Sequence, residues 1–530
     1  MQQSLLDSLV DMQARVGRAC AHLSGDLDGE QVQLYDLALC RAELDGAHAL
    51  AQFALNNSAD AEFLSVITST CIAQALLDVH TRLVARPADF GLQAQDLTLP
   101  DIGDLLGANR LTEIGRQFMD RQQDHLPDGL DAEKRMMRDS FEQFGRDVVV
   151  PLAADIHRAD LIIPEAILQP LREMGCFGLS VPTRWGGLKP DDHEDSLGMV
   201  VVTQALSRAS LGAAGSLITR PEIMARAIME GGTVEQQERW LPGLAAGQPL
   251  CAISVTEPDT GSDVAAVTMK AERVPGGWNL TGNKTWCTFA GKAGAILVLA
   301  RTHPDVRPLH KGLSLFVVEK PSSDGHEFVH EQAAGGRMSG RAIPTLGYRG
   351  MHSFEMRYDD FFVPADNLIG GTSGEGRGFY FTMRGFMGGR LQTAARACGL
   401  IQAAMSSAMQ YAQDRRVFGK PLADYPVTLA KIARMGMMLM TCQQFTYAVA
   451  RMMDKGEGAM EASLVKLLAC RAAEWVTREA LQIHGGMGYA EETPVSRYFV
   501  DARVLSIFEG AEETLAIRVI GKDLVSRARS

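Results

Sequence analysis

The sequence has no excess of positive charge. Its 52 Lys and Arg are outnumbered by 64 Asp and Glu, which gives a formal net charge of −12 at pH 7. Nucleic acids and anionic membrane surfaces attract basic proteins, so neither is expected as a partner of this chain. A global count of this kind still leaves room for a local basic pocket that binds an anionic nucleotide.

Closely spaced cysteines and long apolar runs are missing as well. No apolar run approaches the length of a membrane span, and Asp7 and Asp11 fit neither a secretory signal nor an acid-poor transit peptide. The cysteines are odd in number and form no C-x-x-C pair, as expected for reduced thiols. These absences predict a cytoplasmic protein. The nine cysteines are Cys20, Cys40, Cys71, Cys176, Cys251, Cys287, Cys398, Cys442 and Cys470.

The 530 residues are too many for one hydrophobic core, so three or four domains are expected. Helical spacing of apolar residues dominates both ends of the chain, and short β segments fill the part between them. This order predicts an α+β protein. Its expected parts are an N-terminal helical extension (1–110), a helical domain (111–246), a middle β domain (247–365) and a C-terminal helical bundle (366–530).

Residues 253–263, ISVTEPDTGSD, combine a strand-like start with a polar turn. Ile253, Val255 and Thr256 fit a strand, and Pro258 and Gly261 then break it. Backbone N–H groups and hydroxyls that converge at such a turn can cradle a phosphate. Because a polar turn with glycine is usually only a turn, this stretch taken alone favours the interpretation without a ligand.

A second β segment, GNKTWCT at 282–288, follows the hairpin-like turn Pro275-Gly276-Gly277 and returns to the same place. It presents Trp286 and Thr288. An indole can stack on a planar cofactor, and a threonine hydroxyl can hydrogen-bond to the edge of its ring.

Together, EPDTGSD and GNKTW resemble the acyl-CoA dehydrogenase family of flavoenzymes. The resemblance implies a helical domain, a β domain and a four-helix bundle, with FAD as cofactor and an acyl-CoA as substrate. Family members usually begin near Leu111, so the N-terminal extension is a departure; we interpret it as a packing or dimerisation module, with a lid over the active site as the alternative. Further matches are GLSVPTRWGG (178–187), QQERWLPGLAAG (236–247), RRVFGKPL (415–422), LQIHGGMGY (481–489) and SIFEGAEE (506–513).

The resemblance also implies which residues contact the cofactor. Three departures, Val417, Ala511 and Glu513, stand where Thr, Thr and Gln are common, and each puts an individual FAD contact in doubt. The implied contacts are Ile253, Val255 and Thr256 along the isoalloxazine, Trp286 and Thr288 at its reactive face, Gly261 and Ser262 near phosphate and CoA, Arg415 and Phe418 across a subunit interface, and Gln482 and Gly486 near the adenine half.

Glu509 lies in SIFEGA, directly after the apolar Ile507 and Phe508. A carboxylate in such a setting loses solvation, which suits a general base. Acids at 509, 512 and 513 also suit the positive end of a helix dipole, and spacing alone favours that interpretation. The resemblance implies instead that Glu509 takes the α proton of the thioester while a hydride leaves the β carbon for flavin N5. Its backbone N–H and a ribityl hydroxyl would bind the thioester oxygen.

Arg220, in SLITRP, lies in a region that lines the acyl pocket in the family. It would pair with a second carboxylate of the substrate, although a surface arginine before a proline-initiated helix explains it equally well. Ser262 and Arg390 match positions that contact CoA. With the extension and residues 335–355, the chain is similar to the branch of the family that oxidises (2S)-methylsuccinyl-CoA to mesaconyl-CoA.

The resemblance implies two partners, an electron-transferring flavoprotein as acceptor and further copies of the chain in a homodimer or homotetramer. An acyl-CoA oxidase with the same half-reaction is one alternative. A flavin-containing nucleic-acid-binding relative is another, against which Glu509 and the acidic net charge speak.

His326 and His330 fit the H-E-x-x-H pattern of zinc proteases. That chemistry needs both histidines on one face of a helix. Here the motif follows a β segment and a loop, so a chance match in an exposed hairpin is the better interpretation, and no metal site is expected.

Overall fold

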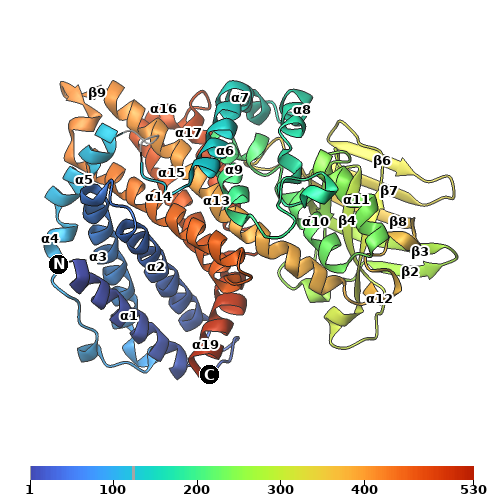
Figure 1. The fold of residues 1–530 in the computed structure, drawn as a ribbon, viewed down its shortest axis with the longest axis horizontal. Helices are drawn as coiled ribbons and strands as arrows, with labels where there is room; N and C mark the ends of the chain where they lie inside the picture. Colours follow the sequence, from blue (N-terminus) through green and yellow to red (C-terminus); the bar gives the residue numbers. More distant parts are fainter. Residues whose placement is uncertain (1, 122–125, 530) are drawn as a thin grey trace. The chain divides into compact units, whose positions relative to one another are not determined.

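The computed structural model describes residues 2–121 and 126–529. The chain divides into two compact units, Met1–Ser140 with Thr393–Ser530, and Phe141–Gln392. The first unit is helical and the second is built on a β-sheet, so the predicted α+β class is confirmed (Figure 1). Helix α13 (Gly378–Asp414) carries the chain from the second unit into the first.

The first unit consists of helices and one short hairpin. The hairpin is formed by β9 (Arg416–Val417) and β10 (Lys420–Pro421). The helices are α1 (Gln2–His22), α2 (Gln31–Leu55), α3 (Ala61–Ala85), α4 (Gly103–Leu106), α5 (Ala108–Arg121), α6 (Ala132–Phe144), the second part of α13, α14 (Pro426–Met453), α15 (Ala459–His484), α16 (Gly486–Tyr489), α17 (Pro494–Leu505), α18 (Glu512–Thr514) and α19 (Lys522–Arg529).

Helices α5 and α14 pack with their backbones close together because each has a glycine at the contact. A Cβ on Gly115 of α5 would lie 2.2 Å from the carbonyl oxygen of Leu429 in α14. A Cβ on Gly436 of α14 would lie 2.4 Å from the ring of Phe118 in α5. Phe118 in turn meets Phe63 of α3 edge-on, with ring centroids 5.5 Å apart. Close packing of this kind leaves no room for added side-chain atoms.

The N-terminal helices α1, α2 and α3 pack on the C-terminal helices within the first unit (Figure 1). Gly46 of α2 faces α14 and α15, where a Cβ would lie 2.6 Å from Leu468 and 3.0 Å from Thr441. At the far end of the chain, Arg529 of α19 donates to the backbone carbonyl of Leu23, which follows α1. The first and last parts of the sequence therefore share one hydrophobic core.

Helix α3 corrects an expectation from the sequence. By length and composition alone it could cross a membrane, and 67% of its most apolar window is buried inside the structure. Ile67, Ile72 and Leu76 of this helix have no exposed surface. Thr and Ser residues interrupt the apolar run, which is why the sequence did not suggest a span. Burial of this extent is typical of a core helix in a bundle.

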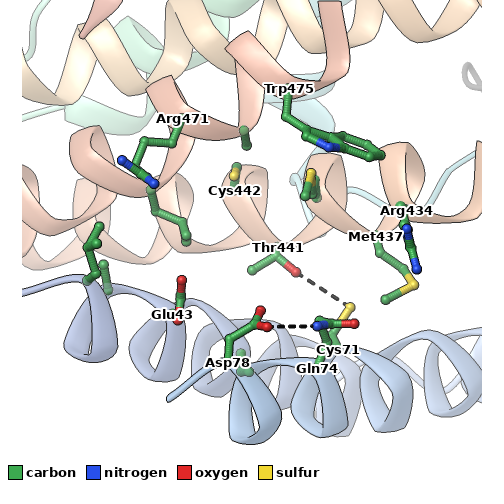
Figure 2. Close-up of a pocket in the computed structure, with 17 residues that line it drawn as sticks. Glu43, Cys71, Gln74, Asp78, Arg434, Met437, Thr441, Cys442, Arg471 and Trp475 are labelled. Atoms are coloured by element: carbon green, nitrogen blue, oxygen red, sulfur yellow. Dashed lines mark hydrogen bonds between the residues drawn. The ribbon is translucent and has the colours of Figure 1, made fainter. Parts of the chain in front are cut away.

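A cavity of about 480 Å³ lies between the N-terminal helices α2 and α3 and the bundle helices α14 and α15 (Figure 2). Glu43 and Asp78 line one side, and Arg434, Arg471 and Trp475 line the other. None of the residues that the sequence predicts to bind FAD or substrate is among those that line this cavity.

The second unit combines helices with a sheet of order β1–β4–β2–β3–β8–β7–β6, in which β5 also pairs with β4. Its strands are β1 (Cys251–Ser254), β2 (Lys270–Val274), β3 (Gly277–Thr288), β4 (Ala295–Arg301), β5 (Leu313–Glu319), β6 (Glu327–Glu331), β7 (Arg337–Ala342) and β8 (Ser353–Pro364). Its helices are α7 (Val150–Arg158), α8 (Glu165–Glu173), α9 (Ser196–Ala209), α10 (Thr219–Gly231), α11 (Val234–Ala246), α12 (Gly371–Gly374) and the start of α13.

Strand β4 is buried on both faces and separates two hydrophobic cores. Leu297 and Leu299 pack into a cluster with residues of α10 and α11, including Ile228. Ile296 and Val298 point the other way, into a cluster built from β3, β5 and β8. A strand covered on both faces reads as a continuous apolar run, which explains the sequence AILVLAR.

The H-E-x-x-H motif lies in the hairpin of β6 and β7, where Glu327 pairs with Arg341 and Glu331 with Arg337. The motif is therefore extended rather than helical, as the sequence predicted.

Candidate active site

In the second unit, β1 and the turn after it place the EPDTGSD motif. Ile253 and Thr256 are half-buried and Val255 is buried, whereas Gly261 and Ser262 are exposed. The nearest obstacle to a Cβ on Gly261 is the Thr256 methyl at 3.8 Å. The turn therefore leaves open space beside its backbone, as a phosphate cradle requires.

A buried ion pair joins the two motifs, and sequence reasoning missed it. Lys284 of β3 donates to Glu257 at 3.0 Å and to the carbonyl of Val255 at 2.8 Å. Glu257 also accepts from the backbone N–H groups of Thr268 and Met269, at 2.7 and 2.8 Å. Burial raises the pKa of the Glu257 carboxyl, but Lys284 and these N–H groups outweigh it and hold the pKa below its usual value.

This ion pair fixes the position of the turn relative to β3. The backbone N–H of Thr285 donates to the carbonyl of Thr256 at 2.9 Å, and a hydrogen bond of 3.1 Å joins Ser254 Oγ to Cys287 Sγ. The residues predicted to lie along and above the isoalloxazine, on β1 and β3, are thereby brought together in one unit. Glu257 of EPDTGSD and Lys284 of GNKTW therefore have a structural role that the sequence did not indicate.

Trp286 and Thr288 end β3 in an unusual backbone. The register of β3 with β8 shifts between Lys284 and Cys287, which marks a bulge. Trp286 has φ 57° and its residue surface is 55% exposed. The Thr288 side chain is buried, and its hydroxyl lies 3.0 Å from that of Ser353. A bulge that turns an indole outward suits stacking on a planar ring.

These residues fit the flavin that the sequence predicts. An exposed indole, a neighbouring hydroxyl and an unobstructed polar turn supply a stacking surface, a hydrogen-bonding group and an anion cradle in one unit. The second unit therefore offers groups that suit the isoalloxazine ring and a phosphate of FAD.

Arg220, at the start of α10, is only 7% exposed. Its Nη1 donates to the carbonyl of Ser216 at 3.1 Å and to the hydroxyl of Tyr348 at 3.2 Å. Among residues 2–121 and 126–529, no carboxylate forms an ion pair with Arg220, although a buried charge is normally paired. Arg390, on α13, is half-buried in the same unit. Tyr348, which lies 128 residues from Arg220 in sequence, could not have been found by motif.

Glu509, in the first unit, occupies a tight turn between α17 and α18. It has φ 55° and Gly510 has φ 99°. The buried Lys466 of α15 donates to the carbonyl of Gly510, and Arg396 of α13 lies over the ring of Phe508, 4.9 Å from its centroid. The carboxylate is half-buried. Contacts on either side of it fix its backbone, as a positioned base requires.

Glu512 anchors the same turn and connects it to the N-terminal helices. Its carboxylate accepts from Arg471 of α15 at 2.6 Å and from the hydroxyl of Tyr35 in α2. Arg471 also donates to the Tyr35 hydroxyl at 3.1 Å. A side chain of the N-terminal extension therefore supports the segment that carries Glu509, a connection for which the sequence gave no signal.

The other predicted FAD contacts of the first unit lie on its surface. Arg415 follows α13, and Phe418 forms the tip of the β9–β10 hairpin with φ 48° and 94% exposure. Gln482 and Gly486 flank the end of α15 and are exposed. The predicted residues thus form one group in each unit.

Three family models match the chain. Residues 131–248 match acyl-CoA dehydrogenase, N-terminal domain, residues 252–361 match the middle domain, and residues 376–524 match the C-terminal domain. Every residue predicted to contact FAD or substrate lies within these three ranges.

Named relatives and solved structures agree with the models. A (2S)-methylsuccinyl-CoA dehydrogenase of Cereibacter sphaeroides is 43% identical over 399 residues, 75% of this chain and 70% of that protein. A mitochondrial 2-methylacyl-CoA dehydrogenase of Solanum tuberosum is 32% identical over 74% of this chain and 91% of that protein. The structure of butyryl-CoA dehydrogenase from Megasphaera elsdenii superposes with a TM-score of 0.68 at 28% identity, covering 75% of this chain and all of that one.

Proposed function

The chain belongs to the acyl-CoA dehydrogenase family, and from this premise we propose that it oxidises (2S)-methylsuccinyl-CoA to mesaconyl-CoA. It is an oxidoreductase that dehydrogenates an acyl-CoA thioester with FAD as its cofactor. The finer choice of substrate is supported by the relative from Cereibacter sphaeroides and by the unpaired charge of Arg220.

When bound, FAD supplies the acceptor for the hydride that leaves the β carbon. On the protein side, Trp286 and Thr288 would hold the ring, and the Gly261–Ser262 turn would bind phosphate. An acyl-CoA α proton is too weakly acidic to leave without a base close by, so a positioned carboxylate is required. We assign this role to Glu509, whose backbone is fixed by Lys466 and by the anchored Glu512.

Replacement of Glu509 by Gln tests the assignment of the base. The amide keeps the size of the side chain but cannot accept the α proton, so turnover should fall by roughly 10²- to 10⁴-fold. Flavin absorbance of the purified protein and anaerobic bleaching of the flavin by methylsuccinyl-CoA are the measurements. The variant should remain yellow.

Glu513→Gln is the matched control, because it makes the same chemical change four residues away at an exposed position. It should keep turnover. Retained bleaching in Glu509→Gln would remove Glu509 as the base, and equal losses in both variants would point to damage of the shared turn.

Arg220 carries the proposal that the acyl chain ends in a second carboxylate. A guanidinium that is almost fully buried, with no acidic partner among the described residues, needs an anion when the site is filled. Tyr348 and the Ser216 carbonyl hold its Nη1, which orients the planar group. The remaining N–H groups are then available for bidentate binding of a carboxylate.

The test compares Arg220→Met with the parent on two thioesters, methylsuccinyl-CoA and 2-methylbutyryl-CoA, in which a methyl replaces the carboxylate. Loss of the charge should lower kcat/KM for the dicarboxylic substrate by roughly 100- to 1,000-fold, because it leaves the substrate carboxylate buried and unpaired. The monocarboxylic substrate should lose little or even gain. Equal losses on both substrates would contradict a role in carboxylate recognition.

An electron-transferring flavoprotein is the proposed electron acceptor. Peroxide formation in air, compared with reduction of an artificial acceptor, distinguishes this from the oxidase alternative. An oxidase would form stoichiometric peroxide.

We also propose a homodimer or homotetramer in the cytoplasm. An aromatic side chain that is 94% exposed at a hairpin tip, as Phe418 is, would be covered by a second subunit. Nine buried thiols, none in a disulfide, suit a reducing compartment.

The oligomer is tested through Phe418. Phe418→Ala should lower retention of FAD at unchanged folding, and light scattering of the parent should give a mass of at least two chains.

A further inference from the structure

His326, His352 and Asp160 come from three parts of the second unit and meet at one point. Asp160 follows α7, His326 precedes β6, and His352 precedes β8. Their potential ligand atoms all lie within 4.8 Å of one another. Nε2 of His352 is 3.1 Å from Oδ1 of Asp160, and the two imidazole rings are 4.4 Å apart between centroids.

We propose that these three residues, the His–His–Asp cluster, bind one divalent transition-metal ion, and that zinc is the occupant. Two imidazole nitrogens and one carboxylate oxygen are a ligand set that zinc accepts, with water in the remaining position. Bonds of about 2.0–2.2 Å in a tetrahedral site place the ligand atoms of one ion roughly 3.3 Å apart. The pair formed by His352 and Asp160 already has this spacing.

Two of the three residues have a constrained backbone, and the third has an exposed side chain. This combination allows the exposed ligand to move onto an ion that the other two already bind. His352 is buried with φ 37°, and Asp160 has φ 51°, so both are held in left-handed backbone. His326 is exposed and lies just before the first residue of β6. Because its side chain is exposed, His326 has room to rotate toward the other two ligands.

Arg349 is the one cation that the described contacts place beside this cluster. Its Nε lies 3.8 Å from Oδ1 of Asp160, while its guanidinium also donates to the carbonyls of Thr345 and His157 at 3.2 and 3.0 Å. Its charge opposes a second cation, so binding should be weaker than in a closed four-ligand zinc site. Because two carbonyls hold Arg349, the guanidinium does not depend on the Asp160 carboxylate for its position.

An ion bound here would cross-link the turn after α7, the β6–β7 hairpin and the start of β8. The carbonyl of His352 accepts from the N–H of Phe289 at 2.8 Å, and the next residue, Ser353, meets the hydroxyl of Thr288. The cross-link would thus stabilise the end of β3 through the contacts of His352 and Ser353. The site is independent of the proposed substrate, and its test needs no turnover.

The test uses the full-length, FAD-loaded protein without an affinity tag, treated with a chelator and dialysed. Zinc is titrated by calorimetry, cobalt is titrated by absorption, and the melting temperature is measured with and without zinc. The variants are Asp160→Asn, His326→Ala and the control His330→Ala. His330 belongs to the same hairpin, but it lies four positions further along the chain, about 13 Å from His326 in extended backbone.

The parent and His330→Ala should bind one zinc per chain, show the visible bands of cobalt bound by nitrogen and oxygen, and melt at a higher temperature with zinc. Binding by His326→Ala and Asp160→Asn should weaken by more than the roughly 10- to 100-fold that loss of an outer-shell partner costs. His326 is exposed, so its replacement should not unfold the chain. No saturable binding by the parent, or an equal loss in His330→Ala, would overturn the proposal.

Discussion

Left-handed backbone is concentrated at the residues to which we assign chemistry. None of these residues is a glycine, yet φ lies between 37° and 60° at Trp286, Glu509, Phe418, Tyr348 and His352. Such a conformation costs on the order of 1–3 kcal/mol per residue, so the surrounding structure must impose it. For Glu509 the imposing contacts are those of Lys466 and the Glu512 anchor; for Trp286 it is the bulge in β3. The strain therefore supports the proposed roles independently of the motifs.

Lys320 offers a test of electrostatics at a single residue. Its ammonium is buried, donates to the carbonyls of Gly291 and Pro321 at 2.7 and 2.9 Å, and lies 4.3 Å from the centroid of the Phe328 ring. Burial lowers the pKa of Lys320 from 10.5 to about 8. Between these values the folded protein binds fewer protons than the unfolded chain, so this group makes stability rise with pH.

Lys320→Met should therefore stabilise the protein near pH 7, by at most about 3 kcal/mol. The advantage should shrink as the pH rises from 8 towards 10, because the parent then loses the buried charge. Melting temperatures of the parent and the variant across this range are the measurement. The exposed Lys270 provides the control substitution, Lys270→Met. A constant difference between Lys320→Met and the parent over the whole range would contradict the depressed pKa.

At the scale of elements, the contact between helices α5 and α14 depends on Gly115 having no side chain. The Cβ of an alanine at Gly115 would lie 2.2 Å from a backbone carbonyl of α14, which has no rotamer to change. Gly115→Ala should destabilise the protein by about 1–3 kcal/mol because the helices must separate.

Gly17→Ala is the matched control for this prediction. Gly17 also lies within a helix, α1, but a Cβ there would meet nothing within 4 Å. The substitution should stabilise the chain by up to about 1 kcal/mol, the difference in helix propensity. Chemical denaturation of both variants is the measurement. A neutral or stabilising effect of Gly115→Ala would show that α5 and α14 can move apart at little cost.

The sequence predicted helices and strands well where apolar residues repeat with one regular spacing. It did not predict the contacts that join residues far apart in the chain. The helical character of residues 1–110 was expected and is found in α1, α2 and α3, and the motifs led to Trp286 and Glu509. The ion pair of Glu257 with Lys284 spans 27 residues, and the contact of Arg220 with Tyr348 spans 128. No local period encodes such pairs. His326 illustrates the difference, since its sequence partner is His330 and its spatial partner is His352.

For the molecule as a whole, the N-terminal extension is the feature that motifs could not explain. Helix α2 contacts α14 and α15 through Gly46, and its Tyr35 binds Glu512, three residues after the proposed base. These contacts favour a packing role for the extension. They also imply that the first and last parts of the sequence unfold together, since neither can bury its apolar face without the other.

Leu44→Ala tests this cooperativity. Leu44 is fully buried in α2, and its truncation should cost about 2–5 kcal/mol, as cavities in packed cores do. Leu55→Ala, at the exposed end of the same helix, should change stability by less than about 0.5 kcal/mol. Hydrogen exchange should then accelerate in Leu44→Ala across α14 and α15 as well as α2, because the helices share one core and open as one unit. Faster exchange confined to α1, α2 and α3 would mean that the extension unfolds alone, and the idea that it supports the Glu509 turn would fail with it.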